Sequence, residues 1–270
     1  MDPVVVKKGS SPLVLGLPHT GTYVPDDIRA KLNEEGRLLR DTDWHIDTLY
    51  AGLIDEATTV RATFHRYVID ANRDPSGQSL YPGQTTTGLV PVSTFDNTPI
   101  WLDGEEPDDA EIRRRVEMFH APYHAALEAE LERVRAIHGY AVLYDCHSIR
   151  SVIPWLFDGV LPDFNIGTDE GRTCDPLIEN AVYEATKATG RTHVLNGRFR
   201  GGWTTRHYGR PAEGFHTVQM ELSQASHLAS EEPPFDLDAE KTDTLRKQLA
   251  DILTGIMHAA AEAAGRANEH

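Results

Sequence analysis

The chain has 270 residues, and its 42 acidic and 26 basic side chains give a formal net charge of −16 at pH 7. That charge argues against nucleic acid or an anionic membrane as a partner, although a local basic pocket can still bind a small anion. Two cysteines are too few for a disulfide framework and fit a reducing, cytoplasmic setting.

We find no membrane or export signal in the sequence. No run approaches 18 apolar residues, so we expect no transmembrane helix. Residues 1–8 lack a basic segment followed by an apolar one, so we expect no signal peptide. The 40% share of hydrophobic residues is ordinary for a globular protein, and one domain over residues 1–270 is the simplest prediction.

The predicted elements begin with a core strand over residues 13–17, an apolar run bounded by proline on both sides. This strand leads directly into His19 and a turn that contains Gly21, which gives the backbone freedom. A short helix is expected over residues 25–33, because Pro25 and two aspartates are typical of a helix start.

A longer helix is expected over residues 41–54, with Asp41 or Thr42 as its N-cap. Asp43 and Asp47 are four residues apart in this segment. In a helix both carboxylates would therefore lie on one face of the first turns.

The next segments are rich in β-forming residues. Residues 59–64 and 66–70 predict two strands, or one strand and a bend, and Asn72 and Arg73 follow directly. Residues 76–107 contain many Gly, Pro, Thr and Ser residues and show no helical period. An irregular segment of this length is usually functional, so we expect an active-site flap.

The second half of the chain alternates between helices and strands. Helices are expected over residues 108–137 (kinked or split at Pro122), 175–189 and 238–264, and strands over residues 141–144, 163–167, 192–195 and 216–223. Residues 196–214 are expected to form a loop, and residues 266–270 a frayed tail. This alternation predicts a three-layer α/β/α fold with a mixed, mostly parallel sheet.

Polar side chains stand at the ends of several predicted elements, namely His19, Asp43 or Asp47, His147 and Glu221. Ligands of open α/β sheets bind beyond the carboxyl ends of the strands, so these groups could meet there. Two imidazoles and one carboxylate are typical of a catalytic zinc site, and a further carboxylate can act as general base. Each group also has an ordinary alternative role, as a hydrogen-bonded histidine or a helix cap.

Cationic residues suggest an anionic substrate. Arg73 offers a bidentate fork for a carboxylate and Asn72 adds a neutral donor, although Arg73 could instead pair with Asp70 or Asp74.

A glycine-rich loop carries three further arginines. We interpret Arg198 and Arg200 as solvated, whereas Arg206 is a candidate second anion contact. The alternative for Glu221 is a structural salt bridge with Arg206 or Arg210.

Four of these segments together resemble the N-formylglutamate amidohydrolases (deformylases). They are PHTGTYVP at 18–25, DTDWHID at 41–47, RYVIDANR at 66–73 and DCHS at 145–148. The resemblance extends over residues 11–228, and a deeper similarity connects the chain to zinc carboxypeptidases and aspartoacylases. It implies a phosphorylase/hydrolase-like fold with one zinc ion. It also implies cleavage of N-formyl-L-glutamate to formate and L-glutamate, a step of histidine degradation.

The resemblance also implies roles for single residues. His19 and His147 would be zinc ligands, but the acidic ligand of the H-x-x-E pattern is missing, because Thr22 stands in its place. We therefore expect the acid to be Asp43, with Asp47 as the alternative. Asp145 would orient a ligand histidine without binding the metal.

In the implied mechanism, Glu221 takes a proton from a zinc-activated water and delivers it to the leaving amine. Asn72 and Arg73 would hold one carboxylate of a small anionic N-acyl amino acid, and Arg206 the second carboxylate or the oxyanion. The alternatives are a carboxypeptidase-like or peptidoglycan-amidase-like zinc hydrolase, or a binding protein without activity. The metal could also be another divalent transition metal, and a homo-oligomer is possible.

Overall fold

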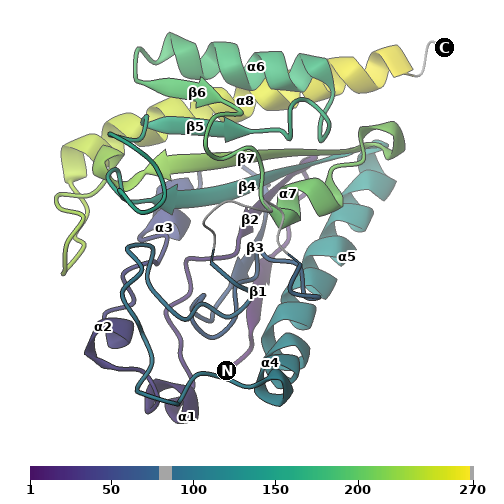
Figure 1. Cartoon of the computed structure of the whole chain (residues 1–270). Helices are drawn as coiled ribbons and strands as arrows, with labels where there is room; N and C mark the ends of the chain where they lie inside the picture. Colours follow the sequence, from purple (N-terminus) through teal and green to yellow (C-terminus); the bar gives the residue numbers. More distant parts are fainter. Residues whose placement is uncertain (79–86, 268–270) are drawn as a thin grey trace.

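A computed structural model of the chain describes residues 1–78 and 87–267, in which seven strands form one mixed sheet (Figure 1). The strands are β1 (Val4–Lys7), β2 (Leu13–Leu17), β3 (Thr58–Ala62), β4 (Ala141–Ile149), β5 (Phe164–Gly167), β6 (His193–Leu195) and β7 (Phe215–Ser223). Their order is β1-β3-β2-β4-β7-β5-β6, with antiparallel pairing of β1 with β3 and of β5 with β7 and parallel pairing elsewhere.

The helices cover both faces of this sheet. They are α1 (Asp26–Arg29), α2 (Glu34–Arg37), α3 (Ile46–Tyr50), α4 (Asp109–Arg115), α5 (Ala121–His138), α6 (Pro176–Ala188), α7 (Trp203–Tyr208) and α8 (Ala239–Ala267), with the short turns η1 (Val116–His120), η2 (Pro211–Glu213) and η3 (Gln224–Ser226). In Figure 1, α6 and α8 lie side by side on one face, and α5 crosses the other. The predicted three-layer α/β/α fold with a mostly parallel sheet is confirmed.

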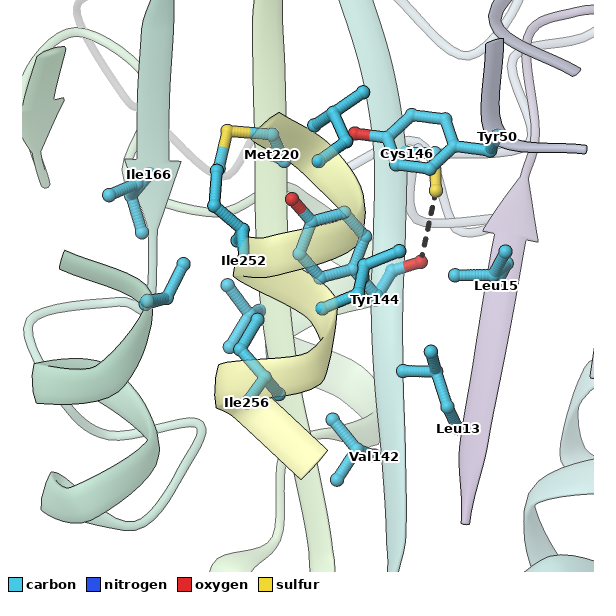
Figure 2. Close-up of a cluster of buried hydrophobic side chains, with 14 of the residues drawn as sticks. Leu13, Leu15, Tyr50, Val142, Tyr144, Cys146, Ile166, Met220, Ile252 and Ile256 are labelled. Carbon is cyan, nitrogen blue, oxygen red and sulfur yellow. Dashed lines mark hydrogen bonds between the residues drawn. The ribbon is translucent and has the colours of Figure 1, made fainter. Parts of the chain in front are cut away.

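The first part of β4, residues 141–144, is apolar at every position because the strand packs against a core on both faces. Val142, Tyr144 and Cys146 enter the core between the sheet and α8, where Figure 2 shows them near Met220 and Ile252. Ala141 and Leu143 enter the opposite core, under α5. A strand covered on both faces loses the alternation of apolar and polar residues. Each fully buried large apolar side chain contributes about 1.5–3 kcal/mol.

The ends of the main helices follow ordinary capping rules. The side chains of Asp108 and Asp175 accept hydrogen bonds from the first-turn amides of α4 and α6, and a proline follows Asp175. Gly139 ends α5 in the left-handed region, with φ of 82°. A π-helical turn, η1, separates α4 from α5 just before Pro122, so the predicted split is present.

The segment at 41–54 differs from the prediction. Only Ile46–Tyr50 is helical, because His45 just before it has a left-handed φ of 60° that breaks a continuous helix. Asp43 therefore lies in a loop, where its backbone N–H donates to the carbonyl of His19. The expectation that Asp43 and Asp47 share a helix face is wrong.

Other boundaries also differ. Residues 66–70 form a turn rather than a strand, closed by a hydrogen bond from the Val68 amide to the His65 carbonyl. The predicted loop at 196–214 contains α7, and β4 extends to Ile149, so Asp145 and His147 lie inside the strand.

The expected flap and tail are only partly described. Residues 79–86 and 268–270 lie outside the described residues, and residues 87–107 are irregular apart from isolated β-bridges. Helix α8 includes residue 266, for which the sequence predicts fraying. Among the described helices, none has the length and apolarity needed to span a bilayer.

Candidate active site

Three residues predicted as metal ligands meet at the carboxyl ends of β2 and β4. The Oδ2 atom of Asp43 lies 3.1 Å from Nδ1 of His147 and 3.8 Å from Nδ1 of His19. One ligand atom from each residue lies within 4.8 Å of the others, and all three side chains are buried. Two ligand atoms bound tetrahedrally to one zinc ion are roughly 3.3 Å apart, so this spacing suits a single metal ion.

One ring nitrogen of His19 is available to bind a metal ion, because only the other nitrogen is hydrogen-bonded among the described residues. Burial, and then the charge of Arg66, lowers the pKa of His19, so the imidazole is neutral. Its Nε2–H donates to Oδ1 of Asp70 over 2.7 Å. The other nitrogen, Nδ1, is buried and has no hydrogen-bond partner within the described part of the chain. A carboxylate behind a histidine in this way is common in metal sites.

Asp70 contacts the candidate ligand His19, and the sequence did not identify it as a site residue. Its carboxylate also accepts hydrogen bonds from Nη2 of Arg66 at 2.5 Å and from the amide of Asn72 at 2.8 Å. Burial would raise the pKa of Asp70, but Arg66, His19 and Arg73 outweigh it and hold that pKa well below its usual value. In the sequence Asp70 stands out only as a possible partner of Arg73, because residues 66–70 predict a strand, in which side chains four positions apart do not meet.

His147 is held from two sides. Its Nε2 lies 3.2 Å from Oδ1 of Asp145 and 3.2 Å from Nδ2 of Asn72, which directs Nδ1 toward Asp43. Burial would lower the pKa of His147, but Asp145 and then Asp43 raise it well above its usual value. A metal ion bound by this histidine would take the place of its proton. Asp145 and His147 are two apart in β4 and share one face, whereas Cys146 faces the opposite core.

Asp47, the alternative acidic ligand, does not join this group. Its side chain is 39% exposed and lies 3.9 Å from Nη1 of Arg61. The carboxylate also accepts a hydrogen bond from the amide of Thr48. Because α3 begins only after Asp43, the helix points Asp47 away from the histidines.

Glu221 stands beside His147, since the two residues are paired in the register of β4 and β7. Burial raises the pKa of Glu221 to about 8; the charge of His147 acts against this and that of Asp43 adds to it. Gln219, two residues earlier on the same face, donates from Nε2 to Glu221 over 3.5 Å and accepts from the amide of Gly202 over 2.6 Å. Gln219 therefore connects Glu221 to the loop before α7.

One cavity contains these groups. Its wall includes His19, Asp43, Asn72, Arg73, His147 and Glu221. Arg66 and Arg198 also line it, whereas Arg206 is not among the described lining residues.

Arg206 lies at a neighbouring surface pocket, where its Nη2 is 3.1 Å from Asp169. Arg198, which we interpreted as solvated, is half-buried and lines both the cavity and this neighbouring surface pocket. Arg210, the other proposed partner of Glu221, pairs with Glu213 at 3.0 Å.

Two histidines of the helical segment before β4 hold the turn at Asn72 and Arg73 in place. His124 and His120 lie with Nε2 at 2.7 Å from the carbonyl of Ala71 and 2.9 Å from that of Arg73, respectively. The Arg73 guanidinium donates from Nε and Nη2 to the carbonyl and hydroxyl of Thr87, each over 3.1 Å. The site is therefore built on hydrogen bonds that connect distant parts of the chain.

The family model for N-formylglutamate amidohydrolases matches residues 11–228, which is most of the chain. The chain belongs to this family. It is 46% identical over 259 residues to an N-formylglutamate deformylase of Pseudomonas putida, covering 94% of this chain and 96% of the relative. It is 44% identical over 262 residues to an N-formylglutamate deformylase of Pseudomonas aeruginosa, covering 95% and 97%.

Solved structures agree with this family assignment. An N-formylglutamate amidohydrolase from Ralstonia eutropha superposes with a TM-score of 0.76 at 26% identity, covering 96% of this chain and 97% of that one. A gene product from Agrobacterium tumefaciens shares the fold, with a TM-score of 0.72 at 19% identity and 96% coverage of each chain. As a member of this amidohydrolase family, the chain is a hydrolase that acts on an amide.

Proposed function

We propose that the chain is a metal-dependent N-formylglutamate deformylase that converts N-formyl-L-glutamate and water into formate and L-glutamate. The observation that carries this proposal is the buried group of His19, Asp43 and His147 with Glu221 beside it. Two deformylases that share 44–46% identity over nearly the whole chain support the choice of substrate.

The metal would be held by Nδ1 of His19, Nδ1 of His147 and the Asp43 carboxylate. Two imidazoles and one carboxylate favour zinc, although iron, cobalt and manganese accept similar ligands. When bound, such an ion polarises a carbonyl oxygen and lowers the pKa of a water molecule. The neutral His19, whose Nδ1 has no hydrogen-bond partner among residues 1–78 and 87–267, fits this role without rearrangement.

Glu221 would move the proton. As the water oxygen bonds to the formyl carbon, Glu221 accepts the water proton, and it then donates that proton to the amide nitrogen as the C–N bond breaks. A general base works best when its pKa lies near the working pH, and burial raises the pKa of Glu221 toward that range. A bound metal ion would lower it again, toward the ionised form that accepts a proton.

Two arginines that line the cavity, Arg66 and Arg73, would bind negative charge. Arg73, beside Asn72, would bind one carboxylate of the substrate. Arg66 donates a hydrogen bond to Asp70, which supports the candidate ligand His19. The buried Nε of Arg66 has no hydrogen-bond partner in the part of the chain that the structure describes. We assign the stabilisation of the oxyanion to Arg66, in place of Arg206.

The proposal extends to the cellular role. Hydrolysis of N-formylglutamate releases glutamate and would serve histidine degradation. The two free, buried cysteines, Cys146 and Cys174, fit a reducing cytoplasm.

The test is the Glu221→Gln variant. We expect it to keep its metal, because Glu221 is not a ligand, and to release formate about 10²–10⁴-fold more slowly. The control is Glu213→Gln, which changes an exposed carboxylate paired with Arg210 and should keep full activity. Wild-type activity in a metal-loaded Glu221→Gln variant would refute the role of Glu221.

A further inference from the structure

We propose that Thr205 is a positioning residue for metal binding, because its hydroxyl holds Asp145 in the direction in which that carboxylate can accept a hydrogen bond from His147. This inference rests on the proposed function and deepens it, since it extends the metal site to helix α7, which carries Thr205 and contributes none of the proposed ligands.

The Nε2 atom of His147 needs a hydrogen-bond acceptor when Nδ1 binds a metal ion. An imidazole that binds a metal through one nitrogen carries its proton on the other, and a carboxylate or carbonyl usually accepts that proton. Oδ1 of Asp145 and Nδ2 of Asn72 each lie 3.2 Å from Nε2 of His147. The Asn72 nitrogen is a donor, and Asn72 is oriented because its Oδ1 accepts from the backbone amide of Thr204 over 2.9 Å. Of these two atoms, only the Asp145 oxygen can therefore accept the proton.

Thr205 supplies a contact that keeps the Asp145 carboxylate in this orientation. The hydroxyl of Thr205 donates to Oδ2 of Asp145 over 3.2 Å, while Oδ1 is the oxygen that faces His147. Both Asp145 and Thr205 are 0% exposed, so water does not compete for this contact. Apart from its contact with His147, Oδ1 has no hydrogen-bond partner in the described part of the chain. The hydroxyl thus occupies one carboxylate oxygen and leaves the other for the histidine.

Helix α7 is itself held in place, so the direction of the hydroxyl is defined. The helix packs against β4 and β7 (Figure 1). The amide of Gly202, just before α7, donates to Oε1 of Gln219 in β7 over 2.6 Å. Gly201 has φ of 109°, and a Cβ atom at this position would lie 3.0 Å from Cγ2 of Thr205. This close packing limits the rotation of the β-branched Thr205 side chain.

The ordinary alternative for Thr205 would be a hydrogen bond within its own helix. A helical threonine can donate to the carbonyl four residues before it, as Thr254 in α8 does to Ala250 over 2.8 Å. The corresponding carbonyl for Thr205 is that of Gly201, which accepts from Nε of Arg206 over 3.0 Å. Thr205 instead directs its hydroxyl to a residue of β4 that is 60 positions away in the sequence. The contact therefore connects the helix to the metal site.

Zinc affinity, measured by competition with a chromophoric chelator in the absence of substrate, tests the inference. Thr205→Val keeps the shape of the side chain and removes the hydroxyl. We expect it to weaken zinc binding by about 3- to 10-fold, less than the roughly 10- to 100-fold typical for a direct partner of a ligand, because Thr205 acts through Asp145. Thr205→Ser keeps the hydroxyl and should bind zinc within about 2-fold of wild type.

The matched control is Thr186→Val. Thr186 is also a helical threonine with 0% exposure, but its hydroxyl has no hydrogen-bond partner among residues 1–78 and 87–267. Its replacement should leave zinc affinity within about 2-fold of wild type. An effect of Thr205→Val no larger than that of this control, or an equal loss in Thr205→Ser, would overturn the inference.

A second background separates positioning from a general structural effect. Asp145→Ala removes the carboxylate through which Thr205 acts, so addition of Thr205→Val to this variant should change zinc affinity by less than about 2-fold. The same loss in both backgrounds would overturn the inference. If Thr205→Val does not fold, Thr205→Ala compared with Thr205→Ser takes its place in both comparisons. Because the zinc assay needs no catalysis, absence of formate release from zinc-loaded wild type would refute the proposed function and leave this inference standing.

Discussion

The carboxylate of Asp70 supports both the metal site and the fold, and its replacement by asparagine separates these effects. Asparagine has almost the same shape but no charge. In the native protein the carboxylate contacts Nε2 of His19 at 2.7 Å and Nη2 of Arg66 at 2.5 Å, and neither Asp70 nor Arg66 is more than 5% exposed. Asp70→Asn therefore leaves a buried guanidinium without its direct counterion.

The expected loss of unfolding free energy follows from this burial. Removal of one partner from a buried ion pair typically costs about 3–5 kcal/mol, because the other charge stays out of water. Asp41 and Asp43 also act favourably on Arg66, so we expect the lower end, about 3 kcal/mol. Loss of the group behind a ligand histidine typically weakens metal binding by about 10- to 100-fold.

The assay is urea unfolding of the metal-free protein, since bound metal would add its own stabilisation. Zinc affinity is then measured by competition with a chromophoric chelator. The matched control is Asp47→Asn, which removes a carboxylate from a partly exposed pair with Arg61 and should cost less than about 1 kcal/mol. If Asp70→Asn changed neither stability nor zinc affinity more than this control, our account of the ligand support would be wrong.

Three further predictions concern other parts of the site. His147→Ala should abolish stoichiometric metal, measured by elemental analysis, whereas His138→Ala at the end of α5 should not. Stoichiometric metal in His147→Ala would refute its role as ligand. Burial lowers the pKa of His124 to about 3 from 6.5, so the unfolded state binds more protons below pH 6.5 and stability falls as pH falls. Between pH 8 and pH 5, His124→Gln should therefore lose about 2 kcal/mol less unfolding free energy than wild type, and equal losses in urea unfolding would contradict this. Gly202→Ala would place a methyl group 2.4 Å from Nδ2 of Asn72 and should raise KM, whereas Gly265→Ala in α8, with no atom near, should not; equal KM values would contradict the tight packing.

The sequence predicted the layers of the fold and most of the site because both depend on local patterns. Apolar runs and capping residues identify strands and helices, and parallel strands bring their carboxyl ends to one edge. The meeting of His19, His147 and Glu221 therefore follows from the strand pattern of the sequence. The order of the strands then decides which residues of that edge become neighbours.

Which of the candidate residues join the site depends on backbone and side-chain directions that a sequence does not specify. The left-handed backbone of His45 removes Asp47 from the site and leaves Asp43 beside the histidines. Asp70 reaches His19 across 51 positions of the chain. Arg206 pairs with Asp169 at the neighbouring surface pocket, a contact between residues that are far apart in the sequence.

The central claim is metal-dependent deformylation, and formate release from N-formyl-L-glutamate tests it most directly. We expect the purified protein to release formate, to lose this activity when a chelator removes the metal, and to regain it on addition of zinc. N-formylaspartate and N-acetylglutamate, measured beside it, define the tolerance of the site. Absence of formate release by metal-loaded protein, or full activity in protein shown to be free of metal, would contradict the account.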